Sequence, residues 1–346
     1  MATTFDIAGQ TFARGTRGIA RIPVTVDLDG GEINIWVHVL AGAQAGPTLL
    51  LLGVQHGDEW GEVEFFRRVV RDTDVTTLSG TLLIIPVASP TALGTLTRLT
   101  QWSADGPDMN RLWPGSFNWI AEQIARKISQ EVLPKVDALL DFHFGMWGNT
   151  LGLMTYGADF PDPKVNEAVR NLAFAYGHPI LHRVNVVGGY PGPRSVMGYA
   201  GLKFGIPGVA AEVGGMGFGV EYENKLHDLN QKGVRNVMRY LGMLPGKPDL
   251  PDRFLDYTVN HRVDPSKGGL LIPAREPDEI LREVKKGEVL ARVVSPYTFE
   301  ELEQLVSPCD GVLNLVPRTY MVRPGDWAFF VADTTQPDSK WVSAPF

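Results

Sequence analysis

The sequence predicts an α/β protein with a mixed, mostly parallel sheet flanked by helices, followed by a small all-β domain. Between residue 46 and about residue 244, apolar strands alternate with stretches of helical period. This alternation implies crossover connections and a sheet covered on both faces. Beyond residue 254 only short strands and turns follow. With 346 residues, 44% of them hydrophobic, the chain can bury two cores, so we expect one domain over residues 1–244 and a β-domain over residues 255–346.

The elements of the first domain follow in order. Residues 17–40 read as a β-hairpin around Asp29, Gly30 and Gly31, with alternate apolar residues on one face. Four further strands are expected, at 48–54, 81–87, 136–144 and 207–215. Four helices are expected from their apolar period, at 62–73, 117–132, 166–177 and 222–244. Ser116 is placed to cap the second of these helices.

A linker and a β-rich region complete the chain. Residues 242–254 contain three prolines and two glycines, which is typical of a connection between domains. The strands expected after it are 268–274, 288–295, 311–317 and 327–332.

Composition and charge exclude several classes of function. The net charge is -7 and no long basic run occurs, so we expect neither nucleic acid nor an anionic membrane as a partner. No segment is apolar enough to span a bilayer, and the N-terminus lacks the pattern of a signal peptide. The single cysteine, Cys309, lies in the turn-like stretch SPCDG without a base beside it. We therefore expect a cytoplasmic protein with a small-molecule substrate and no cysteine nucleophile.

The stretch GVQHGDEWGE, residues 53–62, places a histidine and acids directly after an apolar strand. In α/β enzymes the carboxyl ends of the strands carry the chemistry. His56 and Glu59 follow one strand, and His143 closes another. Two imidazoles and one carboxylate form a ligand set of catalytic zinc, so we predict one Zn²⁺ per chain at these residues. The alternative is that both histidines bond to backbone and that Glu59 only favours a helix N-terminus.

The other histidines do not suggest a second site of this kind. His178 and His182 are four residues apart, but the stretch around them is β-like, and in a strand this spacing separates two side chains too far to share an ion. His38, His227 and His261 have no acid or histidine at a useful offset at a strand end.

Three further polar residues or pairs complete the predicted site. Glu212 ends the strand 207–215, where burial would raise its pKa toward a value useful for a general base; the alternative is a structural ion pair with an arginine. Asn110 and Arg111 suit the binding of a carboxylate. Arg98 could stabilise an oxyanion.

These residues resemble the succinylglutamate desuccinylase/aspartoacylase family, a branch of the zinc carboxypeptidase clan. The resemblance covers residues 45–240 and rests on HGDE, DMNR, DFH and an E-x-G after a strand that begins Pro-Gly. It implies a zinc carboxypeptidase-like fold, zinc on His56, Glu59 and His143, and Glu212 as general base and acid. It also implies that Asn110 and Arg111 hold a substrate carboxylate. The implied activity is hydrolysis that removes an acyl group from an N-acylated amino acid or a related small amide.

The resemblance also bears on the C-terminal domain and on the oligomeric state. Relatives carry a small β-domain and commonly assemble, so we expect a homo-oligomer. The stretches VKKGEVLARV and LVSPCDGVLN are similar to carrier domains that bear biotin or lipoyl groups, but no Met-Lys-Met-like sequence is present. We therefore expect a structural or pocket-shaping domain without a modifiable lysine.

Several alternatives stay open. The family's carbonyl-polarising arginine is missing from its usual early position, which here reads ASPTALGTLTR, so either Arg98 replaces it or the oxyanion depends on zinc and Arg111. An esterase, lactonase or carboxypeptidase could use the same zinc site, and a non-catalytic binding protein is a further alternative. A serine hydrolase is excluded because no G-x-S-x-G occurs. Four tryptophans near the motifs either line a pocket for the acyl group or pack under loops: Trp60, Trp102, Trp113 and Trp147.

Overall fold

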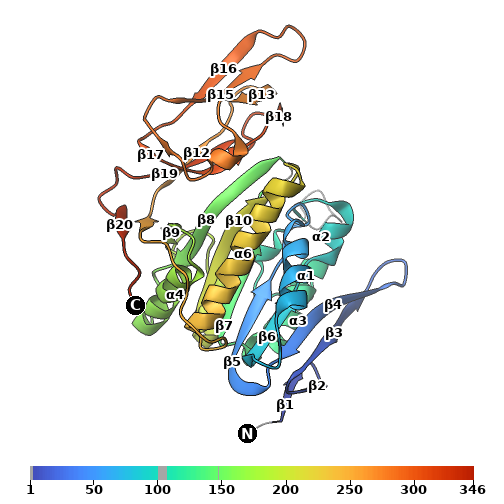
Figure 1. The fold of residues 1–346 in the computed structure, drawn as a ribbon. Coiled ribbons are helices and arrows are strands. Elements are labelled where there is room, and N and C mark those ends of the chain that lie inside the picture. Colours follow the sequence, from blue (N-terminus) through green and yellow to red (C-terminus); the bar gives the residue numbers. More distant parts are fainter. Residues whose placement is uncertain (1–2, 100–106, 147) are drawn as a thin grey trace.

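The computed structural model describes residues 3–99, 107–146 and 148–346, and its main feature is one large sheet (Figure 1). Eight described strands of this sheet lie in the N-terminal region: seven follow one another in the order β8-β10-β7-β5-β6-β4-β3, and β9 (Ile180–Val184) pairs in parallel with β8. Their bounds are β3 (Thr16–Val26), β4 (Glu32–Ala41), β5 (Gln44–Leu52), β6 (Ser79–Ile85), β7 (Ala138–His143), β8 (Asn149–Gly157) and β10 (Gly208–Gly215). The pairs β5/β6, β5/β7 and β7/β10 are parallel, whereas β3/β4, β4/β6 and β8/β10 are antiparallel. The predicted α/β fold with a mixed sheet is confirmed.

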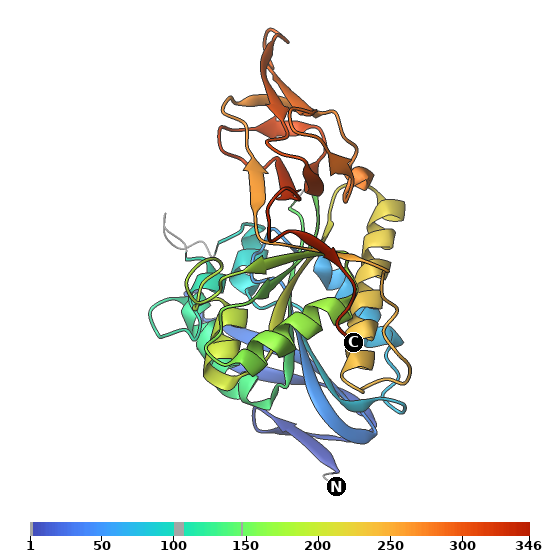
Figure 2. The same cartoon turned by 90° about the vertical axis from the view of Figure 1, so that its left-hand side faces the viewer.

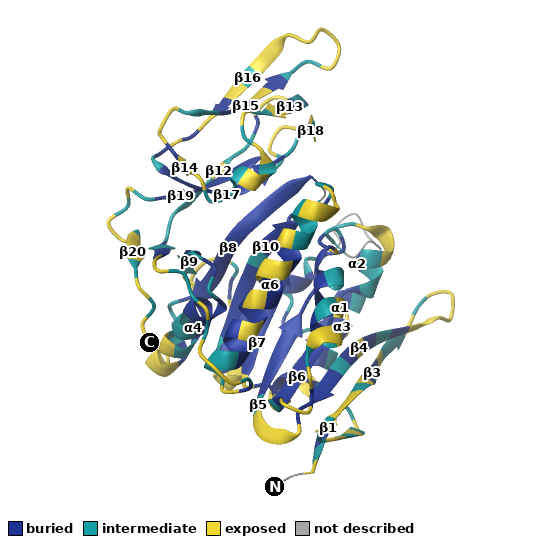
Figure 3. Cartoon of the chain, in the orientation of Figure 1, coloured by how far each residue is buried: buried dark blue, intermediate teal, exposed yellow. Residues whose placement is uncertain are grey.

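Helices cover both faces of this sheet (Figure 2). They are α1 (Glu62–Asp72), α2 (Pro90–Thr95), α3 (Ile120–Glu131), α4 (Pro163–Tyr176), α5 (Val196–Phe204) and α6 (Val220–Tyr240). Side chains alternate along a strand, so consecutive leucines of β5 face opposite sides. Leu49 and Leu51 pack in the core beneath α1, α4 and α6. Leu50 and Leu52 pack in the core beneath α3 and α5. Burial from both sides explains why residues 49–52 of β5 are all apolar, and Figure 3 colours this end of the strand as buried.

The C-terminal region is all-β. Its strands are β11 (Phe254–Tyr257), β12 (Asn260–Val263), β13 (Gly269–Pro273), β14 (Glu283–Val284), β15 (Val289–Val294), β16 (Glu301–Val306), β17 (Gly311–Pro317), β18 (Tyr320–Val322), β19 (Phe329–Asp333) and β20 (Lys340–Val342). Four of them form a separate antiparallel sheet in the order β16-β15-β13-β18.

This region is joined to the first by strand pairing on two sides. β17 pairs antiparallel with β8, with Leu315 opposite Leu151. β11 pairs in parallel with β9 (Ile180–Val184), and β20 pairs with β11. The large sheet therefore continues across residues 242–254, and the C-terminal strands lie beside the end of the sheet from which His143 emerges.

The structure differs from the predicted elements in several places. The helix expected over 117–132 begins only at Ile120, and Trp119, not Ser116, is its N-cap residue. The Ser116 hydroxyl donates to the Glu122 carboxylate and accepts from the backbone N–H of Asn118, which precedes the helix. Strand β8 and the helices α2 and α5 were not predicted, and neither was the separate two-stranded sheet of β1 (Thr4–Ile7) and β2 (Gln10–Ala13). None of the described helices combines the length and hydropathy needed to cross a bilayer.

Candidate metal centre and active site

Two neighbouring parallel strands bring the predicted ligands together. In the register of β5 and β7, Leu52 lies opposite Asp141, so the loop after β5 and the end of β7 meet at one edge of the sheet. The rings of His56 and His143 have centroids 5.1 Å apart. Both rings and the Glu59 side chain are buried. Residues 87 positions apart in the sequence thus form one cluster.

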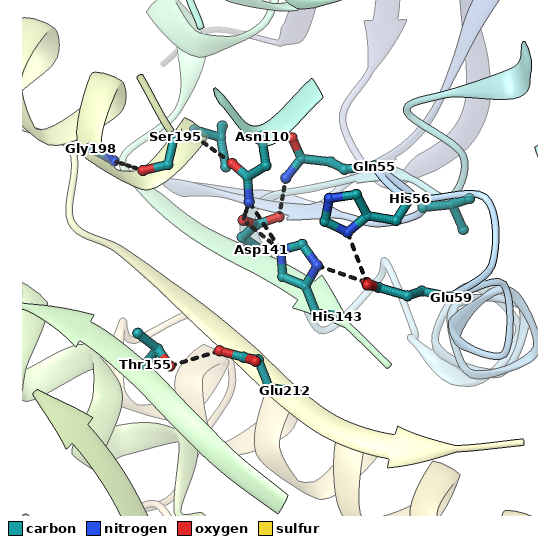
Figure 4. Close-up of polar contacts among 12 residues, drawn as sticks. Gln55, His56, Glu59, Asn110, Asp141, His143, Thr155, Ser195, Gly198 and Glu212 are labelled. Carbon is teal, nitrogen blue, oxygen red and sulfur yellow. Dashed lines mark hydrogen bonds and ion pairs between the residues drawn. The ribbon is translucent and has the colours of Figure 1, made fainter. Parts of the chain in front are cut away.

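The three side chains lie close enough together to hold a metal ion (Figure 4). The Nδ1 atom of His56 lies 2.9 Å from Glu59 Oε1, and the Nδ1 atom of His143 lies 2.8 Å from Glu59 Oε2. One ligand atom from each residue falls within 4.8 Å of the other two. One nitrogen of each imidazole, Nδ1 in both, therefore faces the carboxylate, and a shared ion needs one such nitrogen from each ring.

An aspartate holds the opposite nitrogen of each ring. His56 Nε2 lies 2.9 Å from Asp108 Oδ1, and His143 Nε2 lies 3.2 Å from Asp141 Oδ2. A proton kept on Nε2 and donated to the aspartate leaves the Nδ1 lone pair free to bind a metal. This carboxylate–histidine arrangement fixes the tautomer and raises the basicity of a metal ligand.

The charges within the cluster compensate one another. Burial alone would lower the pKa of His143, but Asp141 and Glu59 together raise this pKa well above its usual value. His56 follows the same pattern through Glu59 and Asp108. Burial alone would raise the pKa of Glu59, whereas the two imidazoles bring it well below the usual value. Without a metal, protons supply the positive charge that this buried carboxylate needs.

Glu212 lies on β10 directly opposite His143 of β7, so both side chains project from the same face of the sheet. Its Oε1 accepts a 2.7 Å hydrogen bond from the hydroxyl of Thr155 on β8 (Figure 4). Burial raises the pKa of Glu212, and the attraction of His143 opposes this shift. A carboxylate with a raised pKa beside a metal-binding cluster suits general acid–base chemistry.

Asn110 and Arg111 lie on a short 3-10 turn (Met109–Arg111) with different surroundings. The Asn110 amide is engaged at both ends, since Nδ2 donates to Asp141 and Oδ1 accepts from the backbone of Val196. Arg111 donates to the Asn110 carbonyl and lies over the ring of Tyr190, 4.5 Å from its centroid. No carboxylate among the described residues forms an ion pair with Arg111.

Arg98 is held beside the cluster by two carboxylates. Its Nη1 donates to Glu59 Oε1 at 2.8 Å, and its Nη2 lies 3.7 Å from Asp108 Oδ2. The guanidinium also lies over the ring of Trp327, 5.6 Å from the centroid. Trp327 belongs to the C-terminal region, so that region contacts Arg98.

All seven predicted site residues line one cavity of about 60 Å³. They are His56, Glu59, Arg98, Asn110, Arg111, His143 and Glu212. Of the two alternatives left open for the tryptophans near the motifs, a place in the lining of this cavity does not hold for the two that are described. Trp113 is buried in the core and donates to Gln55, and Trp60 is partly exposed and does not line this cavity. Trp102 and Trp147 lie outside the described residues.

Sequence reasoning assigned no role to Asp108, Asp141, Thr155 or Trp327. Signals for the first two were present, because Asp108 opens the DMNR motif and Asp141 shares a strand face with His143 in DFH. Thr155 lies on β8, which was not predicted, and Trp327 reaches the cavity only through tertiary structure.

Replacing Asp141 by Asn should weaken zinc binding by roughly 10- to 100-fold, because the charge that orients the His143 ring and increases its basicity is lost. Competition with a chelator measures this change. Asp159→Asn is the matched control, since this carboxylate accepts hydrogen bonds from Val187 and Gly188 outside the cavity. Equal zinc affinity in Asp141→Asn and the wild type would refute the proposed role.

Comparison with known proteins is consistent with this geometry. Residues 45–241 match the model of the succinylglutamate desuccinylase/aspartoacylase catalytic domain. The chain belongs to this family. An N-alpha-acetyl-L-2,4-diaminobutyric acid deacetylase from Halomonas elongata is 27% identical over 336 residues, 92% of each chain. Family membership and the name of this relative together indicate a hydrolase that removes acyl groups.

Two solved structures of the family share the fold. A succinylglutamate desuccinylase from Silicibacter sp. TM1040 has a TM-score of 0.77 at 23% identity and covers 92% of this chain and 94% of its own. The product-bound ectoine utilization protein EutE (DoeB) from Ruegeria pomeroyi has a TM-score of 0.76 at 24% identity, covering 92% and 95%. Each structure covers 92% of this chain. The shared fold therefore extends well beyond residues 45–240, on which the sequence resemblance rests.

Proposed function

We propose that this protein is a zinc-dependent deacylase that hydrolyses the amide bond of an N-acylated amino acid. The observation that carries the proposal is the pair of imidazoles whose Nδ1 atoms both face Glu59 while an aspartate holds each Nε2. The donor set fits zinc, which in catalytic sites takes three protein ligands and leaves a position for water. Zinc bound there would lower the pKa of a water toward about 7 and polarise the scissile carbonyl.

Glu212 acts as the general base and then as the general acid. Its carboxylate takes a proton from the attacking water and delivers this proton to the departing nitrogen. Burial favours the protonated form, so the group can both accept and return a proton. Arg98, which also lines the cavity, stabilises the charge that develops on the carbonyl oxygen.

Burial raises the pKa of Glu212, and the hydrogen bond that Thr155 donates to its carboxylate opposes this shift. Thr155→Val should therefore raise the pKa of Glu212 further. A general base must be ionised, so the acidic limb of the kcat/KM profile should move to higher pH while the rate on the alkaline side changes little. Thr155→Ser, which keeps the hydroxyl, should restore the wild-type profile. Superimposable profiles for Val and wild type would contradict this role.

Arg111 binds the carboxylate of the substrate, because it lines the cavity and pairs with no described carboxylate. Asn110 contributes indirectly, since its amide already holds Asp141 and the backbone of Val196. Arg111→Gln should lower kcat/KM for an N-acetyl amino acid by roughly 10²-fold, mainly through KM.

The corresponding N-acetyl amino acid amide, which lacks the carboxylate, is the matched substrate for this experiment. Wild type should prefer the acid over the amide, and Arg111→Gln should lose that preference. If Arg111→Gln kept the full preference for the acid, a residue other than Arg111 would bind the substrate carboxylate.

A further inference from the structure

We infer that the substrate carries one carboxylate and is otherwise uncharged, both in its acyl group and in the side chain of its amino acid. This inference rests on the proposed deacylase function and specifies its substrate class. The reason is that nearly all charged groups that line the cavity already have partners within the protein.

The carboxylates of the cavity are all engaged. Among the described lining residues, these are Glu59, Asp141 and Glu212. Glu59 contacts both imidazoles and Arg98. Asp141 accepts from Gln55 and lies against His143, and Glu212 is the proposed base. No described carboxylate of the lining remains for a cationic side chain of the substrate.

Of the two guanidinium groups in the described lining of the cavity, one is free to pair with an anion of the substrate. The described lining contains the guanidinium groups of Arg98 and Arg111. Arg98 already pairs with Glu59 and approaches Asp108. Arg111 donates to a backbone carbonyl and lies over an aromatic face; its charge also helps to lower the pKa of Asp108, but no carboxylate in the described part of the chain forms an ion pair with it. A substrate with one carboxylate satisfies this arrangement, whereas a succinyl or aspartyl group would bring a second carboxylate with no free cation to pair with it.

The remaining wall is largely apolar and comes partly from the C-terminal region. Leu151 of β8 and Leu315 of β17 face each other in the register of the two strands and line the cavity. Phe144 and Met146 also line the cavity. So does Asn149, whose buried Oδ1 has no hydrogen-bond partner among the described residues. An ammonium group would therefore meet a neutral acceptor but no counter-charge in the described lining, and burying an unpaired charge is costly.

The aromatic faces do not offer a cation site either. Trp327 lies beneath Arg98 and also beneath Arg262, whose guanidinium carbon is 5.2 Å from the ring centroid. Tyr190 is covered by Arg111. An additional cation at either ring would meet a guanidinium of like charge.

An isosteric pair of substrates tests the inference. N-acetyl-L-norvaline and Nα-acetyl-L-2,4-diaminobutyrate differ only by a terminal methyl against an ammonium group. With zinc-loaded wild-type protein, kcat/KM should be greater for the norvaline compound by roughly 10²-fold, because its side chain leaves no unpaired charge in the cavity. N-succinyl-L-norvaline should also be the poorer substrate by a similar factor.

The outcomes separate the two claims. Equal or faster hydrolysis of the diaminobutyrate or succinyl compound would overturn the substrate class and leave the deacylase function standing. No hydrolysis of any of the three would overturn the proposed function, and the inference with it.

A variant pair tests the charge inventory directly. Met146→Glu places a carboxylate on the apolar wall, whereas Met146→Gln adds a neutral group of the same shape. The ratio of kcat/KM for the diaminobutyrate compound to that for the norvaline compound should rise by roughly tenfold in the Glu variant relative to the Gln variant. An unchanged ratio in two folded, zinc-loaded variants would contradict the placement of the side chain at this wall.

Discussion

Glu212→Gln should lower kcat by roughly 10³-fold, because the amide can neither take a proton from water nor return it to the leaving nitrogen. The variant preserves shape, and its side chain can still accept the hydrogen bond from Thr155. KM and zinc content should therefore stay close to those of the wild type. The effect belongs to the chemical step, so kcat and kcat/KM should fall by the same factor.

Steady-state kinetics combined with elemental analysis of each preparation measures this effect. Glu64→Gln is a suitable control, since this carboxylate pairs with Arg67 and Arg68 on the surface of α1. Retention of more than roughly a tenth of the wild-type kcat by Glu212→Gln would mean that another group is the base.

His143→Ala should abolish stoichiometric zinc binding and, with it, hydrolysis. The substitution removes one of three ligands and leaves Glu59 with a single imidazole partner. It also leaves Asp141 buried without the ring that it orients. The remaining two ligands do not complete a catalytic zinc site of the usual kind.

His261→Ala is the informative control for this experiment. His261 lies in a second cluster with Cys309 and Asp333 whose ligand atoms also approach within 4.8 Å. The Asp333 carboxylate already accepts hydrogen bonds from Thr335 and Gln336, and burial raises the pKa of Cys309 to about 11, which disfavours the thiolate that a metal needs. We therefore expect unchanged zinc content in His261→Ala. If His261→Ala lost zinc while His143→Ala kept it, the metal site would lie in the C-terminal region instead.

The cluster of His56, Glu59 and His143 could be predicted from the sequence because two local rules meet there. A buried strand of a parallel sheet is an apolar run, and the first polar residues after such a run lie at the functional edge. His56 and His143 each follow this rule, and β5 and β7 turn out to be neighbours. Alternation along β7 would also have placed Asp141 beside His143, so this partner could have been predicted with the same reasoning.

Other parts of the site depend on tertiary contacts, which the local sequence pattern cannot predict. β8 is buried along its whole length, and its sequence NTLGLMTYG contains two glycines, which weaken a strand pattern. Thr155 was missed with it. Trp327 reaches Arg98 from more than 200 positions away in the sequence, because the pairing of β17 with β8 carries the C-terminal region to the cavity. The late start of α3 is a further case, since the Ser116 hydroxyl donates to the Glu122 side chain instead of accepting from the helix backbone.

Zinc titration of the metal-free wild-type protein tests the central claim most directly. The protein is stripped with a chelator, zinc is returned in known amounts, and hydrolysis of N-acetyl-L-norvaline and its diaminobutyrate analogue is followed at each step. We expect no hydrolysis without metal, and a hydrolysis rate that rises linearly with added zinc until it reaches a plateau at one zinc per chain. Full activity in the metal-free protein, or no activity toward either compound at any zinc level, would contradict it.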